Sequence, residues 1–400
     1  MASIFQNPNT GRYGYRIYYY DENGKRKSIQ KTGFKLRREA IRVATKLENR
    51  KNETDLDKAE RITFAQFFQE WMDTYKIGRF SESTDNKYKN AQIYIQKYFR
   101  GELLKDITKI DYQKFIDDYA RNHVKDSIYR INGYIRTCIK EAMGEGLIQR
   151  DFTNNVIVTT KKKGKPKELK YLETNVASEL KKIALSNASM LNISAYEILF
   201  ALDTGARYAE IVGMTWDNID FNTNTVSIRR TYDYKQRTGF LPTKTESSIR
   251  DITISNDLKH ELKRLKLQQQ TLFLKQGYPN KNNFVFINNR HEVPTDTAAN
   301  KLLRHYLKMI DHNYYLSKGM SKVDAKNIIK QKSLNHEYIG FHGLRHTHAS
   351  YLISKGLSME YVSQRLGHSN VGITSKVYVH LLSDYKKKED SKAMDFLQNL

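Results

Sequence analysis

The sequence predicts a multidomain protein: a small N-terminal module of β-sheet plus helix, an all-α helical domain, and a C-terminal α+β domain. Three observations support this prediction. Four hundred residues exceed what one hydrophobic core usually organises. The apolar spacing changes along the chain from alternating to helical and then to mixed, and polar segments separate these stretches. We therefore predict domains at 1–58, 59–160 and 171–400, with a basic linker at 161–170.

The charge balance favours a polyanionic partner. Lys and Arg outnumber Asp and Glu by 68 to 44, which gives a net charge of +24. We expect no membrane partner, because no apolar run approaches the roughly 20 residues that span a bilayer and Met1–Thr10 lacks the apolar core of a secretory signal. The single cysteine, Cys138, excludes an intrachain disulfide framework and fits a reducing cytosol. We expect Cys138 to be buried.

The N-terminal module begins with two aromatic and β-branched runs, Tyr13–Tyr20 and Lys27–Phe34, which an Asn-Gly turn signal separates. A helix follows over Leu36–Asn49. Residues 1–52 contain 13 Lys and Arg against four Asp and Glu, and cations interleaved with aromatic rings suit contacts with DNA. A solvated basic surface is the alternative. The candidate DNA-binding residues of this module are Arg12, Arg16, Lys25, Arg26 and Lys27.

The second domain is predicted to be a helical bundle over residues 63–150, after an acidic linker at Thr54–Glu60. Gly144 and Gly146 are expected to end its last long helix. Two apolar stripes at helical spacing predict its core: Phe64, Phe67, Phe68, Trp71 and Tyr75 form one, and Ile128, Ile131, Ile135 and Ile139 form the other.

A flexible basic run, with Lys161, Lys162 and Lys163 as candidate DNA-binding residues, leads into the third domain. That domain is predicted to begin with helices around Val176–Ala184 and Ala195–Asp203 and strands at Thr225–Tyr232 and Ile249–Ile254. The part that follows these strands is predicted to be mainly helical. The polar stretch at 306–338 receives no assigned role.

Candidate catalytic residues occur in separate segments of this domain. Arg207 follows a glycine turn, and Glu210, three residues on along a helix, can orient it. Lys244 lies in a turn between predicted strands. His342 and Arg345 begin a further helix and share a face, so both could meet one phosphate.

The last segment places a histidine and a tyrosine downstream of a short helix. Ser358 can cap this helix and Gly367 can end it, which leaves His368 in a turn. Tyr378 comes ten residues later.

These segments resemble the tyrosine recombinase family, in the family's order and approximate spacing. The match covers Thr204–Glu210, Lys244, His342–His346, Leu366–His368 and Tyr378. The three-part layout is similar to lambda-type integrases, which have an arm-binding N-terminal domain, a helical core-binding domain and a catalytic domain. The resemblance spans essentially the whole chain, although its motifs are specific only after Thr204.

The implied chemistry agrees with what a phosphodiester requires. Attack on phosphorus builds charge on the nonbridging oxygens, and planar guanidiniums such as Arg207 and Arg345 match those oxygens bidentately. Tyr378 is the implied nucleophile. Its reference pKa of about 10 makes a helper necessary, and His342 is the candidate.

The remaining residues have subsidiary roles in this interpretation. Lys244 would protonate the departing 5′ oxygen, and His368 would donate a hydrogen bond to the phosphate. Glu210 and His346 would be supporting residues. Two guanidiniums and an ammonium can replace Mg²⁺, and a 3′-phosphotyrosine conserves the bond energy, so we expect no metal and no cofactor.

The resemblance implies a site-specific DNA recombinase, with integrase or excisionase activity for a phage or integrative element, that acts through a 3′-phosphotyrosine and a Holliday junction. The expected partners are double-stranded attachment sites of core and arm type, a homotetramer on DNA, a host DNA-bending protein and an excision factor. The expected location is the bacterial cytoplasm, at the nucleoid.

Alternatives remain at this point. The chain could be a non-catalytic DNA-binding regulator, a metal-dependent nuclease using its histidines, or a type IB topoisomerase. At the C-terminus, Met394, Leu397 and Leu400 form an apolar edge. We expect this edge to dock on a neighbouring protomer, with packing on its own domain as the alternative.

Overall fold

The structure of the chain, a computed structural model, describes residues 2–20, 25–51, 56–162, 171–243, 245–372, 374, 375 and 394. Contacts divide the chain into two units, Met1–Gly164 and Lys165–Leu400. The first unit contains both the sheet module and the helical bundle. The boundaries of the three predicted domains stay a prediction.

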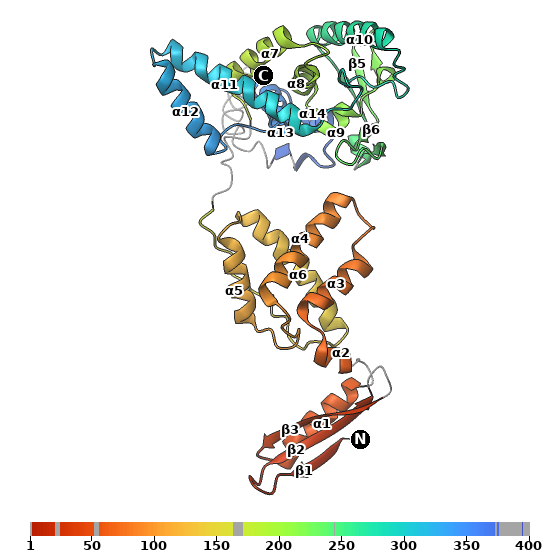
Figure 1. Ribbon diagram of the computed structural model, residues 1–400, viewed down its shortest axis with the longest axis vertical. Helices are drawn as coiled ribbons and strands as arrows, with labels where there is room; N and C mark the ends of the chain where they lie inside the picture. The colour runs from red at the N-terminus through yellow and green to blue at the C-terminus, as the bar shows by residue number, and fades with distance from the viewer. Residues whose placement is uncertain are drawn as a thin grey trace. The chain divides into compact units, whose positions relative to one another are not determined.

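The N-terminal module is a three-stranded antiparallel sheet in the order β1 (Ser3–Gln6), β2 (Tyr13–Tyr20), β3 (Arg26–Phe34). The predicted hairpin pairing of the second and third strands is confirmed, and its tip lies outside the described residues. β1 was not predicted, because four residues are too few to show a periodicity. Helix α1 (Arg37–Lys51) lies along one face of the sheet (Figure 1), where Tyr15 is buried.

The helical bundle confirms most of the predicted core. Gly144 ends its last helix, and Cys138 is buried, which raises the pKa of its thiol. The two predicted stripes are buried except for Tyr75, which is 42% exposed and was wrongly placed in the core. The helices are α2 (Leu56–Arg61), α3 (Phe64–Tyr75), α4 (Glu82–Phe99), α5 (Lys109–Ala120) and α6 (Lys125–Gly144).

The linker predicted at Thr54–Glu60 was wrong in its second half. Residues 56–61 form α2, because Ala59 is buried in the bundle core and the Lys58 ammonium pairs with the Glu70 carboxylate at 2.8 Å. The polar composition of residues 56–61 gave no indication of these contacts. The next helix begins at a capping box in which the Thr63 hydroxyl accepts from the backbone of Gln66.

The second unit is organised around one buried helix, α8, which packs against α7, α10, α11 and α13 (Figure 1). Apolar residues occur on every side of this helix, as expected of a buried helix, and Ser194, Glu197 and Thr204 are buried with them. The helices are α7 (Thr174–Asn187), α8 (Ile193–Thr204), α9 (Tyr208–Val212), α10 (Asn256–Gln276), α11 (Asp296–Ser317), α12 (Lys322–Leu334), α13 (His342–Ser354) and α14 (Met359–Leu366).

Two small antiparallel sheets complete this unit, in the orders β4-β5-β8 and β6-β7. The single strand predicted at Thr225–Tyr232 is two strands, because the chain pairs with β8 before Arg229 and with β7 after it. The strands are β4 (Ile219–Asp220), β5 (Thr225–Ile228), β6 (Arg230–Tyr232), β7 (Phe240–Pro242) and β8 (Arg250–Thr253).

The polar stretch at 306–338 is a pair of helices, the second half of α11 followed by α12. Ala325 and Ile329 are the buried residues of α12, and the Asp311 carboxylate of α11 accepts hydrogen bonds from Lys332 and Tyr338. Because few residues of α12 are buried, this stretch needs few apolar side chains, and so its composition is polar although it is folded. Within the described ranges, no helix combines the length and apolarity needed to cross a membrane.

Candidate active site

The first segment of the candidate site is the turn that follows α8. Gly205 has a φ of +65°, and a Cβ atom there would lie 2.7 Å from the His348 ring and 2.8 Å from a Leu366 methyl group. Glycine is therefore required for both conformation and space. Its carbonyl oxygen accepts a hydrogen bond of 2.8 Å from Nη1 of Arg345. The turn thus joins α8 to the helix that carries the second candidate arginine.

Arg207 lies directly after this turn, at the start of α9, and the predicted contact with Glu210 is present. The Arg207 Nη1 atom is 2.7 Å from Oε1 of Glu210, and the backbone N–H of Arg207 donates to Oε2 at 2.9 Å. Arg207 is one-third exposed at its side chain, whereas the Glu210 side chain is 1% exposed. The carboxylate therefore lies beneath a guanidinium that solvent, or a phosphate, can reach.

Glu210 also binds a second arginine, Arg250, which sequence reasoning missed. The Arg250 Nη2 atom donates to Oε2 of Glu210 at 2.9 Å. Burial alone would raise the pKa of Glu210, but the Arg250 and Arg207 guanidiniums outweigh burial and lower it. A signal was available: in the strand after Ile249, Arg250 alternates in phase with Ile252 and so belongs to the buried face.

The third segment is α13, which begins at His342 as predicted. Arg345 is 3% exposed, and its Nη1 and Nη2 atoms donate to the carbonyls of Gly205 and Leu366 at 2.8 and 2.7 Å. These bonds fix the plane of the guanidinium. His346 packs edge-on against the His342 ring, with ring centroids 5.0 Å apart, and its supporting role stays a prediction.

Burial and the neighbouring guanidiniums of Arg345 and Arg207 lower the pKa of His342. Its imidazole is therefore neutral at pH 7 and can accept a proton. The bond from Arg345 to the Gly205 carbonyl brings the start of α13 beside the Arg207 segment, although more than 130 residues of sequence separate His342 from Arg207.

The fourth segment is the turn after α14. Ser358 caps this helix and Gly367 ends it with a φ of +69°, both as predicted. Nδ1 of His368, the next residue, is 2.8 Å from the Thr374 hydroxyl. Burial is the main cause that lowers the pKa of His368 to about 4, and the Arg345 and Arg207 guanidiniums add to the decrease. When the hydroxyl donates to Nδ1, the proton of the neutral ring is on Nε2, which makes that atom a hydrogen-bond donor.

Lys244 and Tyr378 lie outside the described residues, but their sequence neighbours contact the site. The Ser248 hydroxyl is 3.0 Å from that of Thr245 and 3.4 Å from Nη1 of Arg207. Thr374, which contacts His368, is fully buried and precedes Tyr378 by four residues.

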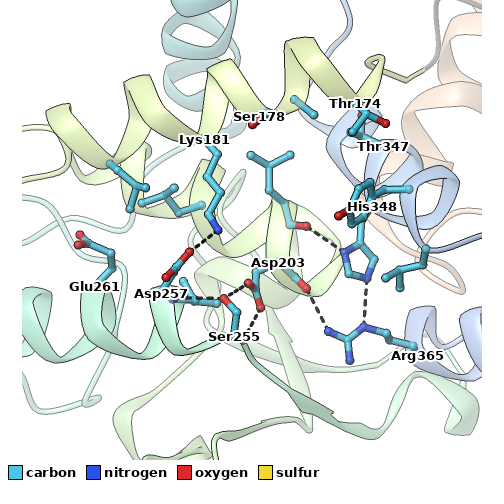
Figure 2. A pocket seen from close by; sticks show the side chains of 17 residues that line it. Thr174, Ser178, Lys181, Asp203, Ser255, Asp257, Glu261, Thr347, His348 and Arg365 are labelled. Atoms are coloured by element: carbon cyan, nitrogen blue, oxygen red, sulfur yellow. Dashed lines mark hydrogen bonds and ion pairs between the residues drawn. The ribbon is translucent and has the colours of Figure 1, made fainter. Parts of the chain in front are cut away.

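A cavity of about 470 Å³ lies behind the site, between α7, α8, the start of α10, α13 and α14 (Figure 2). In its wall, Nε of Arg365 donates to Nε2 of His348 at 3.1 Å, and Nη2 donates to the Asp203 carbonyl at 3.1 Å. Burial and Arg365 lower the pKa of His348 to about 3, so it is neutral. The Lys181 ammonium is 2.6 Å from the Asp257 carboxylate. The Arg365 contacts hold α14, and so the His368 turn, against α8 and α13, whereas the Lys181–Asp257 pair joins α7 to α10.

Most of the predicted DNA-binding residues are exposed where the structure describes them. On the sheet face opposite α1, Arg16 bonds to Gln30 and the Arg26 guanidinium lies 3.9 Å from the Tyr18 ring centroid. Tyr20, on the same face, is 67% exposed. Arg12, Lys25, Lys161 and Lys162 are exposed, Lys27 is half-buried, and Lys163 lies outside the described residues.

The described side chains do not bring three or more His, Cys, Asp or Glu together in a geometry that could hold a metal ion. His342, His346 and His348, which share one helix, face different environments: the first two lie at the candidate site, and the third bonds to the Leu202 carbonyl at 2.9 Å.

Comparison with known families gives matches along most of the chain. Residues 165–384 match the phage integrase family, residues 63–120 match the N-terminal SAM-like domain of phage integrases, and residues 5–51 match an arm DNA-binding domain.

Similar proteins match this chain over most of their length. A tyrosine recombinase XerC-like protein of Caldanaerobacter subterraneus subsp. tengcongensis is 26% identical, with both chains covered completely. The ICEBs1 integrase of Bacillus subtilis is 24% identical over 90% of each chain.

Solved structures show the same fold. The Tn1549 transposon integrase in complex with transposon right end DNA matches with a TM-score of 0.62 at 15% identity, over 83% of this chain and 99% of that one. A lambda integrase dimer bound to a core site matches with a TM-score of 0.53 at 17% identity, over 94% and 93% of the two chains. The α+β unit, with its arginines and histidines around one centre, and the family match over more than half of the sequence lead to one conclusion: the chain belongs to the phage integrase family, and it is a tyrosine site-specific recombinase.

Proposed function

We propose that this protein integrates and excises a mobile DNA element, and that Tyr378 is the nucleophile that cuts and rejoins its attachment sites. One observation carries the proposal: hydrogen bonds from Arg345 to the Gly205 and Leu366 carbonyls, and from Arg207 to the Gly367 carbonyl, gather the segments that contain Arg207, His342, Arg345 and His368 into one electropositive site. An electropositive, partly buried site suits a scissile phosphate, because charge develops on the nonbridging oxygens during attack.

The two arginines would form the phosphate clamp. Glu210 orients Arg207, and the carbonyls of Gly205 and Leu366 orient Arg345. A guanidinium that is fixed before the substrate arrives needs little reorganisation when negative charge develops, and this is the largest catalytic contribution in many enzymes.

The remaining residues would move protons. The Tyr378 oxygen attacks phosphorus and its proton passes to the neutral His342, while the bond to the 5′ oxygen breaks and Lys244 protonates that oxygen. The products are a 3′-phosphotyrosine and a free 5′ hydroxyl. Attack by the 5′ hydroxyl of a second strand reverses these steps and completes the exchange, so neither ATP nor a metal is required.

We propose a tetramer on DNA as the working assembly. Exchange between two duplexes needs four cleavages, and each protomer supplies one tyrosine. A lambda integrase tetramer bound to a Holliday junction matches this chain with a TM-score of 0.52 at 17% identity. The module at 1–58 would bind arm-type sites, the bundle at 59–160 and the unit at 171–400 would bind the core site, and Lys161–Lys163 would lie along DNA between them. A host DNA-bending protein and an excision factor are the proposed further partners.

The proposed function can be tested by incubating the protein with two duplexes that carry candidate attachment sites, one of them end-labelled. We expect recombinant duplexes and a Holliday junction, in equal yield with and without EDTA. Binding without cleavage would favour the regulator, cleavage that EDTA stops would favour a metal-dependent nuclease, and rejoining only within one duplex would favour a topoisomerase. Each of these three outcomes would overturn the proposal.

A further inference from the structure

Arg250 lies where three segments of the candidate site meet. Its Nη2 atom donates to Oε2 of Glu210 at 2.9 Å, its Nε atom donates to the Arg365 carbonyl at 2.7 Å, and its Nη1 atom donates to the Ser248 carbonyl at 2.8 Å. These acceptors belong to α9, to the last turn of α14 and to the segment that follows Lys244. One side chain therefore ties together three parts of the chain that each adjoin a proposed catalytic residue.

Arg250 is buried and closely packed. The residue is 9% exposed, and a Cβ atom on Gly367 would come within 2.8 Å of its Nη1 atom and 2.9 Å of the Ser247 carbonyl. The turn before His368 therefore packs directly on the Arg250 guanidinium. Because the Gly367 carbonyl is itself 3.3 Å from Nη2 of Arg207, this turn lies between the two arginines.

We propose that Arg250 is a positioning residue for DNA cleavage, which sets Arg207 through Glu210 and sets His368 through the end of α14. The proposal rests on the proposed roles of Arg207 and His368. Arg207 Nη1 bonds to one carboxylate oxygen of Glu210 while Arg250 and the Arg207 backbone N–H bond to the other. Both oxygens of the carboxylate are thereby fixed, and the direction of the Arg207 side chain with them.

A purely structural role would have a different signature. Breaking a buried ion pair by removing one partner destabilises a protein whether or not the pair adjoins a site. Arg264 on α10 provides a control: its guanidinium pairs with the buried Glu261, and its Nη2 atom donates to the Ala188 carbonyl at 3.2 Å, away from the site. Its side chain is 37% exposed against 7% for Arg250, so the loss of stability in each variant is measured and not assumed to be equal. Arg264→Ala removes the same kind of group from the same unit.

The test compares Arg250→Ala and Arg264→Ala in the full-length protein on core-site DNA nicked so that cleavage is irreversible. The scissile group is either the natural phosphodiester or a methylphosphonate, in which a methyl group replaces one nonbridging oxygen and removes the charge. DNA affinity and melting temperature are measured in parallel, and Arg250→Lys is included because lysine keeps the charge without the three directed bonds.

Arg250→Ala should cleave the phosphodiester about 100-fold more slowly than the parent, since small displacements of a positioned group have effects of this size. The deficit should shrink to roughly tenfold or less on the methylphosphonate, because the uncharged group depends less on the clamp. Arg250→Lys should cleave the phosphodiester at a rate between those of the parent and Arg250→Ala. Arg264→Ala should lower the melting temperature while cleaving both substrates at the parent rate.

An equal deficit of Arg250→Ala on both substrates, or a parent-like rate on the phosphodiester, would overturn the positioning role. Failure of the parent protein itself to form a covalent complex with either substrate would instead count against the proposed function. The two failures are therefore distinguishable, with Tyr378→Phe as the control that marks the absence of covalent cleavage.

Discussion

At the scale of single residues, the site owes its charge pattern to burial among fixed partners. Glu210 stays ionised because the Arg250 and Arg207 guanidiniums flank it, whereas His342 and His368 stay neutral because burial and the Arg345 and Arg207 guanidiniums disfavour a further positive charge. The candidate site therefore favours the binding of an anionic group, and its neutral imidazoles can take part in proton transfer.

Replacing Arg207 with lysine should reduce cleavage by roughly 10² to 10³, because a point-like ammonium cannot bind two phosphate oxygens in the plane that Glu210 sets. DNA affinity should change little, since most of it comes from other phosphate contacts. Single-turnover cleavage and binding assays measure the two effects separately. Near-parent cleavage by Arg207→Lys would remove this arginine from the proposed clamp.

Glu197 gives a prediction for stability. Its carboxyl is fully buried in α8, 3.3 Å from the Tyr208 hydroxyl, and burial raises its pKa to about 8. Between pH 6.5 and 8 the unfolded chain has lost this proton while the folded protein still holds it, so stability falls as pH rises. The histidines with lowered pKa values act in the opposite direction at the lower end of this window, because in the unfolded chain they still bind protons near pH 6.5, so the effect of Glu197 is read by comparison with a variant that keeps the same histidines.

Glu197→Gln should remove this dependence, because glutamine has nearly the same shape and does not titrate. Relative to the variant, the parent should lose roughly 2 kcal/mol of unfolding free energy between pH 6.5 and 8, at about 1.4 kcal/mol for each pKa unit. Denaturant titrations at the two pH values measure it. Parallel pH profiles of parent and variant would contradict the assignment of a raised pKa.

At the scale of helices and strands, the sequence predicted elements wherever periodicity was long or capping residues were explicit. The hairpin partners β2 and β3, the stripe on α6, and the start of α13 and end of α14 are in this class. The Arg207–Glu210 contact was also predictable, since residues three apart on a helix adjoin.

Other features depend on long-range contacts that a single sequence does not display. β1 exists because β2 offers it an edge, and α2 exists because Ala59 reaches the bundle core. The place of Arg250 was missed for a related reason. Its three partners are 2, 40 and 115 residues away along the chain, and only folding brings them together.

The sheet of the N-terminal module gives a prediction at this scale. Arg16→Ala with Arg26→Ala removes two cations from its open face and should weaken arm-site binding strongly while leaving core-site cleavage intact. Arg42→Ala with Lys46→Ala, which removes the same charge from exposed positions of α1, is the control and should weaken binding less. Equal losses would mean that the module contributes only general charge. Titrations with arm-site and core-site duplexes distinguish these outcomes.

At the scale of the whole molecule, the net charge of +24 predicts how binding responds to salt. Each phosphate contact releases condensed counterions, so log affinity should fall linearly with log salt with a slope of about −0.9 for every phosphate neutralised. We expect a steep slope for the full chain, measured on core-site DNA. A nearly flat dependence would contradict the electrostatic account of DNA binding.

The assembly itself stays a prediction. The apolar edge at Met394, Leu397 and Leu400 lies outside the described residues except for Met394, which is 56% exposed. Docking of this edge on a neighbouring protomer would couple the placement of Tyr378 to assembly, because the same C-terminal stretch contains both.

The most direct measurement is the identity of the residue that becomes joined to DNA. The protein is incubated with nicked core-site DNA, the covalent complex is digested with protease, and the peptide that carries the nucleotide is sequenced by mass spectrometry. We expect a 3′-phosphodiester on Tyr378, no adduct in Tyr378→Phe, and nearly unchanged DNA affinity in that variant. An adduct on another residue, or a covalent complex that persists in Tyr378→Phe, would contradict this expectation.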